Sequence, residues 1–270
     1  MREILTISAV FGGSRAIVRF SRPRLEGMWP LSSAVSPRLV EAPFTGSTNA
    51  DLVAALRGGE QWPHLGVLLT RDQRRGRGRL DRAWLAPAGS SLAVSVAIDA
   101  ARIPASRRGW IPLLAGTAMA GAAGEQLDGV GVKWPNDLLV GGRKLCGILA
   151  EVATADRIVV GAGINTHMTA EQLPVETATS FEVLGVEVDE DRLLAGYLTR
   201  LGALLDTLER GSVRDDVREA CITLGQRVTA HLPGGDTLTG TATGLAEDGR
   251  LEIDGTPVGA GDIIHLRPAP

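Results

Sequence analysis

Residues 129–152 read GVGVKWPNDLLVGGRKLCGILAEV, and this stretch carries the strongest fold signal in the chain. Two apolar runs with the composition of buried strands lie on either side of Gly141-Gly142. A glycine pair between two such runs is typical of a two-residue hairpin, because both turn positions then need a positive φ. The stretch therefore predicts two neighbouring antiparallel strands of a buried sheet.

Polar residues interrupt this hairpin at two points. The segment KWPND at 133–137 lies where a proline breaks the first strand, at a sheet end of the kind where ligand clefts form. Lys144 begins the second strand, and on an ideal strand it shares a face with Cys146 and Ile148. An ammonium on an apolar face suits a cation held for a ligand. A plain Asn-Asp turn and an edge lysine that discourages aggregation are the alternatives.

Residues 71–84, RDQRRGRGRLDRAW, gather six arginines in a chain whose formal net charge is -3. Glycines allow close backbone approach to an anion, and guanidinium groups supply planar donors. Apolar runs at 65–70 and 91–98 predict strands on both sides, so the arginines form a long connecting loop, a class that is usually functional. Trp84 at its end is either a core anchor or a stacking partner for a purine base. A solvated surface loop and a nucleic-acid contact are the alternatives.

Composition sets broad limits on the function. The chain has 270 residues, 44% of them hydrophobic, which is enough to bury a core in one or two domains. Its 28 Lys+Arg against 31 Asp+Glu lack the basic footprint of a sequence-independent nucleic-acid binder. Two cysteines without a metal-type spacing favour a reducing cytoplasm, and Cys146 is interpreted as a packing residue. No transmembrane segment or signal peptide is predicted.

The chain divides into three parts by composition. Residues 1–42 mix Ser, Pro, Arg and Gly without a lasting period and are predicted to be an irregular extension. Residues 43–222 alternate strand and helix patterns, with helices expected from an N-cap at Thr48 to a stop at Gly58, over 111–127, from 189 to 211 and over 213–224. Residues 223–270 contain short strand-like runs and Gly/Asp turns that predict a small barrel.

Five short motifs occur in the order found in one family. They are GSTN at 46–49, GRGRxxRxW at 76–84, KWPND at 133–137, GRKLxGIL at 142–149 and GAGIN at 161–165. Each is weak alone; GAGIN, for example, lacks the third glycine of a dinucleotide fingerprint, and close backbone packing explains its glycines equally well. Together, and followed by an all-β segment, they closely resemble biotin protein ligases.

This resemblance implies an α+β fold and a two-step reaction. The fold would be a class II aminoacyl-tRNA synthetase-like catalytic domain, a mixed sheet flanked by helices, followed by a small SH3-like barrel. The reaction would use ATP and Mg²⁺ to convert biotin to biotinoyl-5′-AMP, and then biotinylate one lysine of the biotin carboxyl carrier domain of an acyl-CoA or pyruvate carboxylase. A weak homodimer is compatible with the resemblance. Some members carry an N-terminal winged helix that represses biotin genes; residues 1–42 are too few and too irregular for one, so no operator DNA binding is predicted.

The resemblance also implies the site residues. Lys144, bridging the biotin carboxylate and the α-phosphate, and Arg77 would be catalytic. The implied biotin-binding residues are Ser47, Thr48, Asn49, Gln73, Gly76, Arg77, Arg79, Lys144, Gly147 and Gly161. The implied nucleotide-binding residues are Arg79, Arg82, Trp84, Asn136, Asp137, Lys144 and Asn165, with Trp84 stacked on adenine; no metal ligand is assigned.

One position departs from the pattern of the family. Asp81 stands where the arginine-rich loop usually has glycine, and we expect its carboxylate to pair with Arg79 or Arg82 and to weaken retention of the adenylate. Three other functions stay open at this point: a lipoate ligase-like acyl transferase, a nucleic-acid-binding module using the arginine-rich loop, and a non-catalytic biotin binder.

Overall fold

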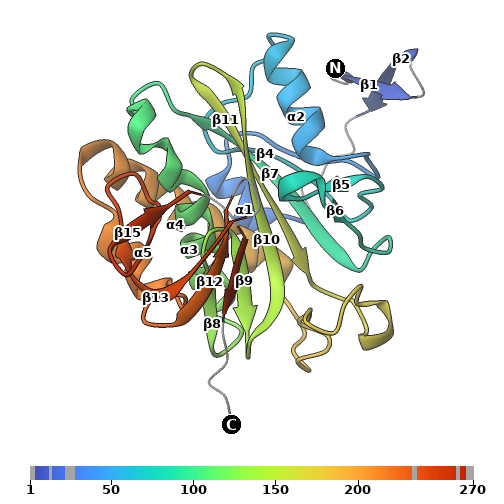
Figure 1. Cartoon of the computed structure of the whole chain (residues 1–270). Helices are drawn as coiled ribbons and strands as arrows, with labels where there is room; N and C mark the ends of the chain where they lie inside the picture. The colour runs from blue at the N-terminus through green and yellow to red at the C-terminus, as the bar shows by residue number, and fades with distance from the viewer. Residues whose placement is uncertain (1–3, 12–13, 22–27, 233–235, 260–261, 266–270) are drawn as a thin grey trace.

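A seven-stranded sheet forms the centre of the molecule (Figure 1). The computed structural model describes residues 4–11, 14–21, 28–232, 236–259 and 262–265. The strands of this sheet are β3 (Leu39–Glu41), β4 (Gly66–Thr70), β7 (Ser91–Asp99), β8 (Val130–Lys133), β9 (Asp137–Val140), β10 (Arg143–Thr154) and β11 (Arg157–Asn165). Their order is β3-β4-β7-β11-β10-β9-β8; β3 and β4 pair in parallel and the other neighbours pair antiparallel. The predicted mixed sheet is confirmed.

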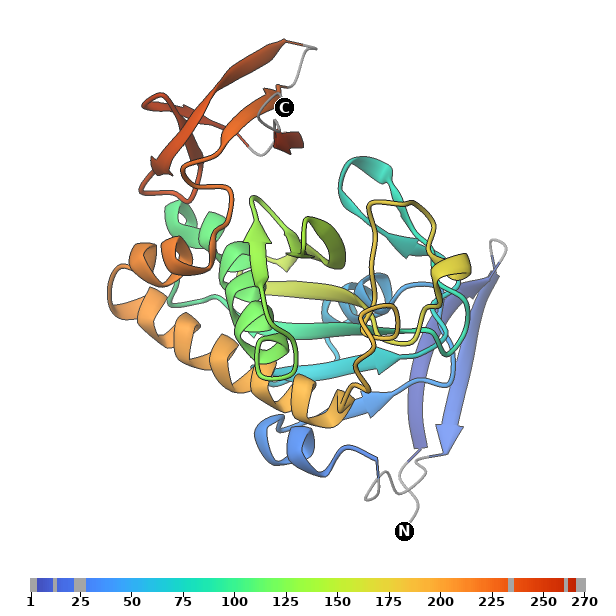
Figure 2. The ribbon, with the colours of Figure 1, turned by 90° about the horizontal axis from the view of Figure 1, so that it is seen from below.

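Helices cover both faces of this sheet. The α-helices are α1 (Pro30–Val35), α2 (Thr48–Arg57), α3 (Ile111–Ala123), α4 (Glu190–Arg210) and α5 (Arg214–Ala220), and the 3-10 helices are η1 (Arg79–Asp81), η2 (Ala105–Trp110) and η3 (Ala170–Gln172). α3 and α4 lie side by side against one face, and α2 packs on the other (Figure 2). Because both faces are covered, β7 is buried along nearly its whole length and its sequence is almost continuously apolar.

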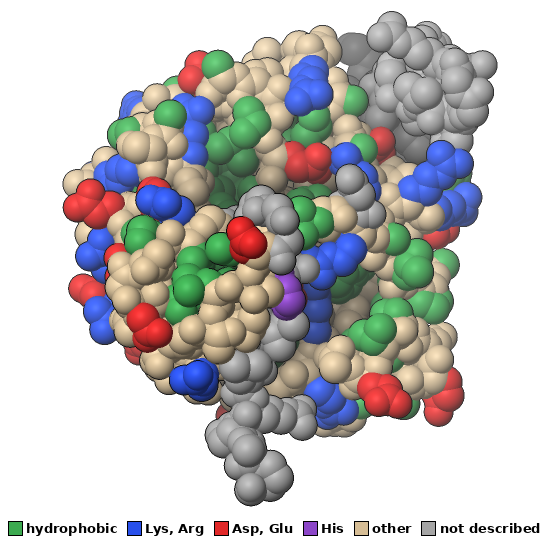
Figure 3. Space-filling view, in the orientation of Figure 1, with side chains coloured by type: hydrophobic (Ala, Val, Ile, Leu, Met, Phe, Trp, Pro, Cys, Tyr) green, Lys and Arg blue, Asp and Glu red, His purple; other side chains and the backbone are tan. Residues whose placement is uncertain are grey.

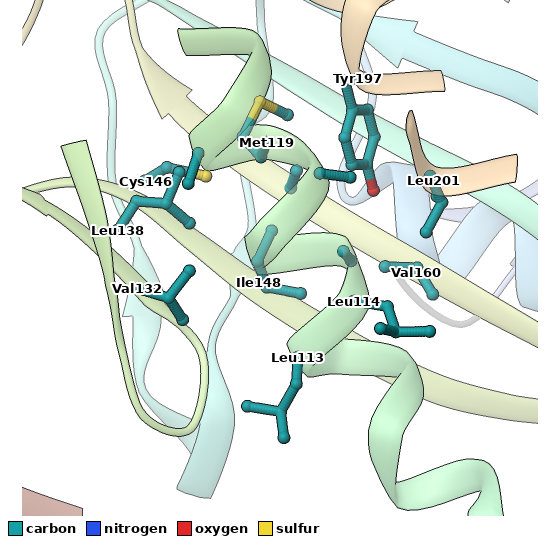
Figure 4. Close-up of a cluster of buried hydrophobic side chains, with 14 of the residues drawn as sticks. Leu113, Leu114, Met119, Val132, Leu138, Cys146, Ile148, Val160, Tyr197 and Leu201 are labelled. Atoms are coloured by element: carbon teal, nitrogen blue, oxygen red, sulfur yellow. The ribbon is translucent and has the colours of Figure 1, made fainter. Parts of the chain in front are cut away.

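The larger core lies between the sheet and the α3–α4 pair. Figure 4 shows side chains of α3, including Leu114, and of α4, including Tyr197, meeting strand residues such as Ile148 and Val160. Cys146 is part of this cluster, and burial raises the pKa of its thiol far above the ordinary value. It is a packing residue, as predicted.

The helix starts follow from capping. The Ser47 side chain accepts a hydrogen bond from the backbone of Ala50 and caps α2, so the N-cap is Ser47 and not Thr48 as predicted. The Asp189 side chain caps α4 in the same way by accepting from the backbone N–H of Arg192. The helices predicted over 111–127 and 213–224 are real but shorter.

The hairpin predicted at Gly141-Gly142 is confirmed, with φ of 55° and 77° at the two glycines. The face assigned to Lys144 was wrong. The register against β9 shifts between Lys144 and Cys146, and this irregularity sends Cys146 into the core while Lys144 stays half-exposed. A bulge leaves no clear signal in the hydrophobic pattern. The prediction assumed the strict alternation of an ideal strand and therefore assigned Lys144 to the wrong face.

Parts of residues 1–42, which were predicted to form an irregular extension, have regular secondary structure. Two strands, β1 (Ile4–Phe11) and β2 (Ser14–Ser21), pair antiparallel, and they precede α1 and β3. Trp29 is fully buried in the main core, and the backbone N–H groups of Leu31 and Ser32 donate to the Asp191 carboxylate of α4 at 2.8 and 2.9 Å. The segment around α1 is held by contacts with distant residues, and such contacts leave no periodic pattern in its sequence.

The C-terminal lobe is a small antiparallel sheet. Its strands are β12 (Arg227–His231), β13 (Thr237–Leu245), β14 (Leu251–Ile253), β15 (Thr256–Val258) and β16 (Asp262–His265), ordered β15-β14-β13-β12-β16. Figure 2 shows this lobe beyond one end of the main sheet. The arrangement fits the predicted SH3-like domain. Within the described part of the chain, no helix is both long and apolar enough to cross a membrane.

Candidate active site

A cavity of about 520 Å³ opens where the arginine-rich loop crosses the sheet. Figure 3 shows Lys and Arg side chains at the edge of a hollow on this face. The structure brings together most of the predicted site residues here, namely Ser47, Thr48, Asn49, Gln73, Arg77, Arg79, Arg82, Trp84, Asn136, Asp137, Lys144, Gly147 and Gly161. Residues from the N-terminus of α2, the loop, the β8–β9 turn and two central strands therefore share one site.

Two predicted residues do not line this cavity. Gly76 is a buried residue of the loop, where an added Cβ atom would lie 2.5 Å from the Trp84 carbonyl oxygen, so it allows β5 and β6 to approach closely. Asn165 is buried at the end of β11, and its side-chain amide donates to the Thr179 carbonyl at 2.9 Å. Asn165 therefore anchors the segment that follows β11, and the structure does not place it at the nucleotide side of the cavity.

One end of the cavity is a fixed set of neutral polar groups around the start of α2. The Gln73 side-chain oxygen accepts from the Thr48 backbone at 2.9 Å and from the Thr48 hydroxyl at 3.2 Å. The Ser95 hydroxyl donates to Asn49 Oδ1 at 2.6 Å and also lies 2.8 Å from Thr48 Oγ1. Ser47, Thr48 and Asn49 are all buried. Such pre-bonded groups suit a neutral polar ring more than an anion.

Glycines of β10 and β11 form the floor. A Cβ atom on Gly161 would overlap the Asn49 amide, and one on Gly163 would lie 2.6 Å from the Trp84 indole. At Gly147 it would come within 3.2 Å of the same indole and 3.3 Å of Lys144. The GAGIN glycines therefore let Asn49 and Trp84 lie directly on the sheet.

Lys144 lies between the two ends of the cavity. Its ammonium is 2.7 Å from Asp137 Oδ1 and 5.7 Å from the centre of the Trp84 ring. Its backbone N–H donates to Thr177 and its carbonyl accepts from Thr179, which fixes the strand at this point. Cations dominate the described lining: Arg77, Arg79, Arg82, Lys133 and Lys144 against the single carboxylate of Asp137. A chain of net charge -3 thus presents a locally positive cavity.

The arginine-rich loop has local structure of its own. β5 (Gly76–Arg77) pairs with β6 (Ala83–Trp84), with η1 between them. We call residues 76–84 the lid. Arg77 Nη2 donates to both carboxylate oxygens of Glu151 at 2.9 Å, and Arg79 Nη1 donates to Asn136 Oδ1 at 2.9 Å. The side chain of Asp81 lies outside the described part of the structure, so its predicted pairing stays a prediction.

Not every arginine of this segment belongs to the site. Arg71 forms ion pairs with Glu41 at 2.8 Å and with the buried Glu190 at 2.6 Å, and its guanidinium lies 4.9 Å from the centre of the Trp29 ring. These contacts join β3, β4 and α4. Arg71 is therefore structural, and the sequence, which shows only a run of arginines, does not separate it from Arg77 or Arg79.

Polar residues outside the predicted set of site residues also lie near the cavity. Ser95 and Glu151 each interrupt an otherwise apolar strand, which is a signal that sequence reasoning can use. Glu151 Oε2 accepts from Asn49 Nδ2 at 2.9 Å as well as from Arg77, so it joins the lid to the floor. Lys133 and His231 also line the cavity. His231 comes from the C-terminal lobe, and no spacing in the sequence indicates its approach.

Comparison with known proteins agrees with this fold and site. Residues 41–165 match the biotin/lipoate A/B protein ligase family, and residues 223–266 match the biotin protein ligase C-terminal domain. The fold and the cavity therefore define a protein ligase of the biotin/lipoate class.

Individual relatives narrow the class. The chain is 37% identical over 234 residues to the biotin–[acetyl-CoA-carboxylase] ligase of Mycobacterium tuberculosis, covering 83% of this chain and 87% of that protein. It is 33% identical over 178 residues to the bifunctional ligase/repressor BirA of Escherichia coli, covering 62% of this chain and 53% of BirA. The biotin protein ligase of Aquifex aeolicus in complex with biotin and ATP superposes with a TM-score of 0.71 at 26% identity, covering 86% of this chain and 99% of that one. The chain belongs to the biotin protein ligase family.

Proposed function

We propose that this enzyme, a biotin ligase, uses ATP to convert biotin to biotinoyl-5′-AMP and transfers biotin to one lysine of a carboxylase carrier domain. The observation that carries the proposal is the position of Lys144, whose ammonium is fixed between a neutral polar pocket and a cationic pocket of one cavity. A reaction between a ring-bearing carboxylate and a nucleotide needs this arrangement. The M. tuberculosis and A. aeolicus relatives support the choice of biotin and ATP.

The first step joins two anions. A carboxylate oxygen of biotin attacks the α-phosphorus of ATP, the new bond to phosphorus forms as the bond to the β-phosphate oxygen breaks, and pyrophosphate leaves. Repulsion between the reactants and charge on the phosphoryl oxygens both oppose this step. Lys144, Arg77 and Arg79 offset both, because fixed cations in a cavity stabilise developing charge more strongly than water does. The carrier lysine then attacks the acyl carbon and AMP leaves.

The polar end of the cavity is assigned to the biotin ring. The ureido group carries one carbonyl acceptor and two N–H donors, and Ser47, Thr48, Asn49 and Gln73 present complementary groups there. Gly147 and Gly161 line the same cavity, and the absence of a side chain at each leaves room for Asn49, Trp84 and Lys144 beside the ring. We assign this end to biotin on these grounds.

The other end is assigned to the nucleotide. Trp84 Nε1 is buried and has no hydrogen-bond partner among the described residues, and the indole faces the cavity beside Lys144. An aromatic ring in this position suits stacking on adenine. Arg79, Arg82, Asn136 and Asp137 lie on the same side and are assigned to the nucleotide. Asn165 is omitted because it lies away from the cavity.

Mg²⁺ is proposed to enter with ATP. The described residues contain no group of three or more His, Cys, Asp or Glu side chains arranged to hold a metal ion. Mg²⁺ typically takes one or two carboxylates and completes its shell with substrate phosphates and water. Asp137 fits that role, with Asn136 beside it, and the ion would neutralise phosphate charge when bound.

The lid is proposed to protect the intermediate. A mixed carboxylic–phosphoric anhydride hydrolyses readily, so water must be excluded until the carrier lysine arrives. Residues 76–84 lie over the cavity and are held by side-chain contacts from Arg77 and Arg79, which can open without unfolding the sheet. The cytoplasmic location, the absence of operator binding and the oligomeric state stay predictions from the sequence.

One assay tests the proposal. The protein is incubated with labelled pyrophosphate, ATP and Mg²⁺, and incorporation of label into ATP is followed with biotin, with lipoate or with neither acid. Exchange that depends on biotin supports the assignment. Exchange that depends on lipoate, or that occurs equally without either acid, contradicts it.

A further inference from the structure

One turn of the C-terminal lobe docks directly on the catalytic domain. Residues 246–250 connect β13 and β14, and two of their carbonyl groups accept hydrogen bonds from indoles of the catalytic domain. Trp110 Nε1 donates to the Glu247 carbonyl at 2.8 Å, and Trp134 Nε1 donates to the Gly249 carbonyl at 3.1 Å. Both tryptophans are almost completely buried. Two equivalent contacts therefore dock the same turn.

Glycines make this docking close. A Cβ atom on Gly109 would lie 2.5 Å from the Asp248 carbonyl oxygen, so the two backbones touch directly there. Gly249 has a φ of +85°. A Cβ atom added to Gly249 would lie 3.3 Å from the ring of Trp110. The turn has a conformation that favours glycine, and at Gly249 it lies close against the side chains of Trp110 and Leu113.

Trp134 has a second hydrogen bond, to the segment that leads into the lobe. Its backbone N–H donates to the Thr223 hydroxyl at 2.9 Å, at the start of the segment that leads into the lobe. The neighbouring Ile222 N–H donates to the Val132 carbonyl at 3.0 Å. Trp134 is thus held through its backbone by the linking segment and through its side chain by the lobe.

Trp134 lies in the turn that carries the nucleotide-side residues. Asn136, two residues on, accepts from Arg79 at its side-chain oxygen, 2.9 Å away, and donates through its amide to the Ile148 carbonyl at 3.0 Å. Asp137 pairs with Lys144 at 2.7 Å. A chain of direct contacts therefore runs from the lobe through Trp134 to the lid arginine and to the lysine.

We infer that the C-terminal lobe positions the nucleotide side of the active site through Trp134, which acts as a positioning residue. The inference rests on the proposed function. The biotin side is built differently, since Thr48 and Asn49 bond to Gln73, Ser95 and Glu151 of the catalytic domain. Loosening the contact at Trp134 is therefore expected to raise the KM for ATP and to leave the KM for biotin unchanged.

A matched pair of variants tests this. Trp134→Phe and Trp110→Phe each delete one buried indole N–H that docks the same turn, but only Trp134 belongs to the turn at 133–137. In biotin-dependent ATP–pyrophosphate exchange, Trp134→Phe is expected to raise the KM for ATP about fivefold, the effect of one net hydrogen bond, with the KM for biotin unchanged. Trp110→Phe is expected to change neither constant.

The outcomes separate the inference from the proposed function. The inference is overturned if both variants change the KM for ATP equally, or if neither changes it. In either case, biotin-dependent exchange by the wild type still supports the proposed function. No biotin-dependent exchange by the wild type contradicts the function itself. If thermal melting shows that Trp134→Phe does not fold, Thr223→Val, which removes the acceptor of the Trp134 backbone N–H, takes its place with the same expected split between the two constants.

Discussion

Arg77 in the lid and Glu151 on β10 form a bridge in which one Nη2 atom of the guanidinium lies 2.9 Å from both carboxylate oxygens. The same carboxylate accepts from Asn49 on the floor of the biotin side at 2.9 Å. A single acid thus connects the closed position of the lid to the pocket that it covers. Under the proposed function, we expect this relationship to couple the position of the lid to biotin binding.

Replacing the acid weakens both connections. We expect Glu151→Gln to raise the KM for biotin and the dissociation rate of biotinoyl-5′-AMP by roughly two- to fivefold, because partly exposed ion pairs contribute at most about 1 kcal/mol. Stopped-flow fluorescence of Trp84 and of the other tryptophans measures the dissociation. Asp72→Asn is the control, since it removes the 2.8 Å partner of Arg74 outside the cavity. Equal rates for Glu151→Gln and the wild type would contradict the bridge.

The floor glycine Gly161 has no space for a methyl group. In Gly161→Ala the added Cβ overlaps the Asn49 amide, which is buried and cannot move without losing its bonds to Ser95 and Glu151. Overpacking of this kind costs about 1–3 kcal/mol, so we expect biotin affinity by calorimetry to fall by roughly 5- to 150-fold. Gly46→Ala is the matched variant in the GSTN motif, where an added Cβ meets nothing within 4 Å. Similar losses in both variants would show that the pocket floor is not the cause.

Arg71 is predicted to affect stability rather than catalysis. Arg71→Gln leaves the buried Glu190 carboxylate without its ion-pair partner, which is expected to lower the free energy of unfolding by about 2–4 kcal/mol. Urea denaturation measures this change, and Arg75→Gln, at an exposed position of the same segment, should stay near the wild type. The two variants should differ little in the KM for ATP. A stable Arg71→Gln protein with impaired ATP binding would reverse the assignment.

The thiols are predicted to be unreactive in the folded enzyme. Burial raises the pKa of Cys146 and of Cys221 above the ordinary value of 9.0, so both stay protonated at pH 8, where only a thiolate would react. The folded state holds the two thiol protons more tightly than the unfolded state does. The buried thiols therefore stabilise the folded state below pH 9, and this stabilisation is lost as the pH rises above that value. Iodoacetamide at pH 8 should leave activity intact and label both cysteines only in urea. Rapid inactivation of the native enzyme would contradict the burial argument.

Features that depend on contacts between distant elements could not be predicted from the sequence. The Gly141-Gly142 hairpin and the order of the motifs were readable because turn chemistry and apolar runs are local signals. The side of the sheet on which Lys144 lies could not be predicted, because the register shift against β9 has no sequence signature. Arg71 is structural and Arg77 lies in the lid because they pair with different acids, Glu190 and Glu151. The fold brings both acids from other elements of the chain.

The N-terminal segment shows the same limit. Residues 30–41 form α1 and β3 because Trp29 and Ser32 pack and bond against distant parts of the catalytic domain, and no periodic pattern marks them. Asn165 was placed at the nucleotide by its position in a motif, whereas its side chain bonds to Thr179. A motif locates a segment of chain, but the direction of each side chain depends on its packing.

The central claim is that Lys144 serves the adenylation of biotin in this cavity. The most direct measurement is biotin transfer to a purified carrier domain with ATP and Mg²⁺, followed by mass spectrometry, for the wild type and Lys144→Ala. We expect the wild type to add one biotin to the carrier, and Lys144→Ala, folded by circular dichroism, to be slower by a factor of at least about 100, as for loss of one group that stabilises charge in the transition state. Equal transfer by the two proteins, or no transfer by the wild type, would contradict the account.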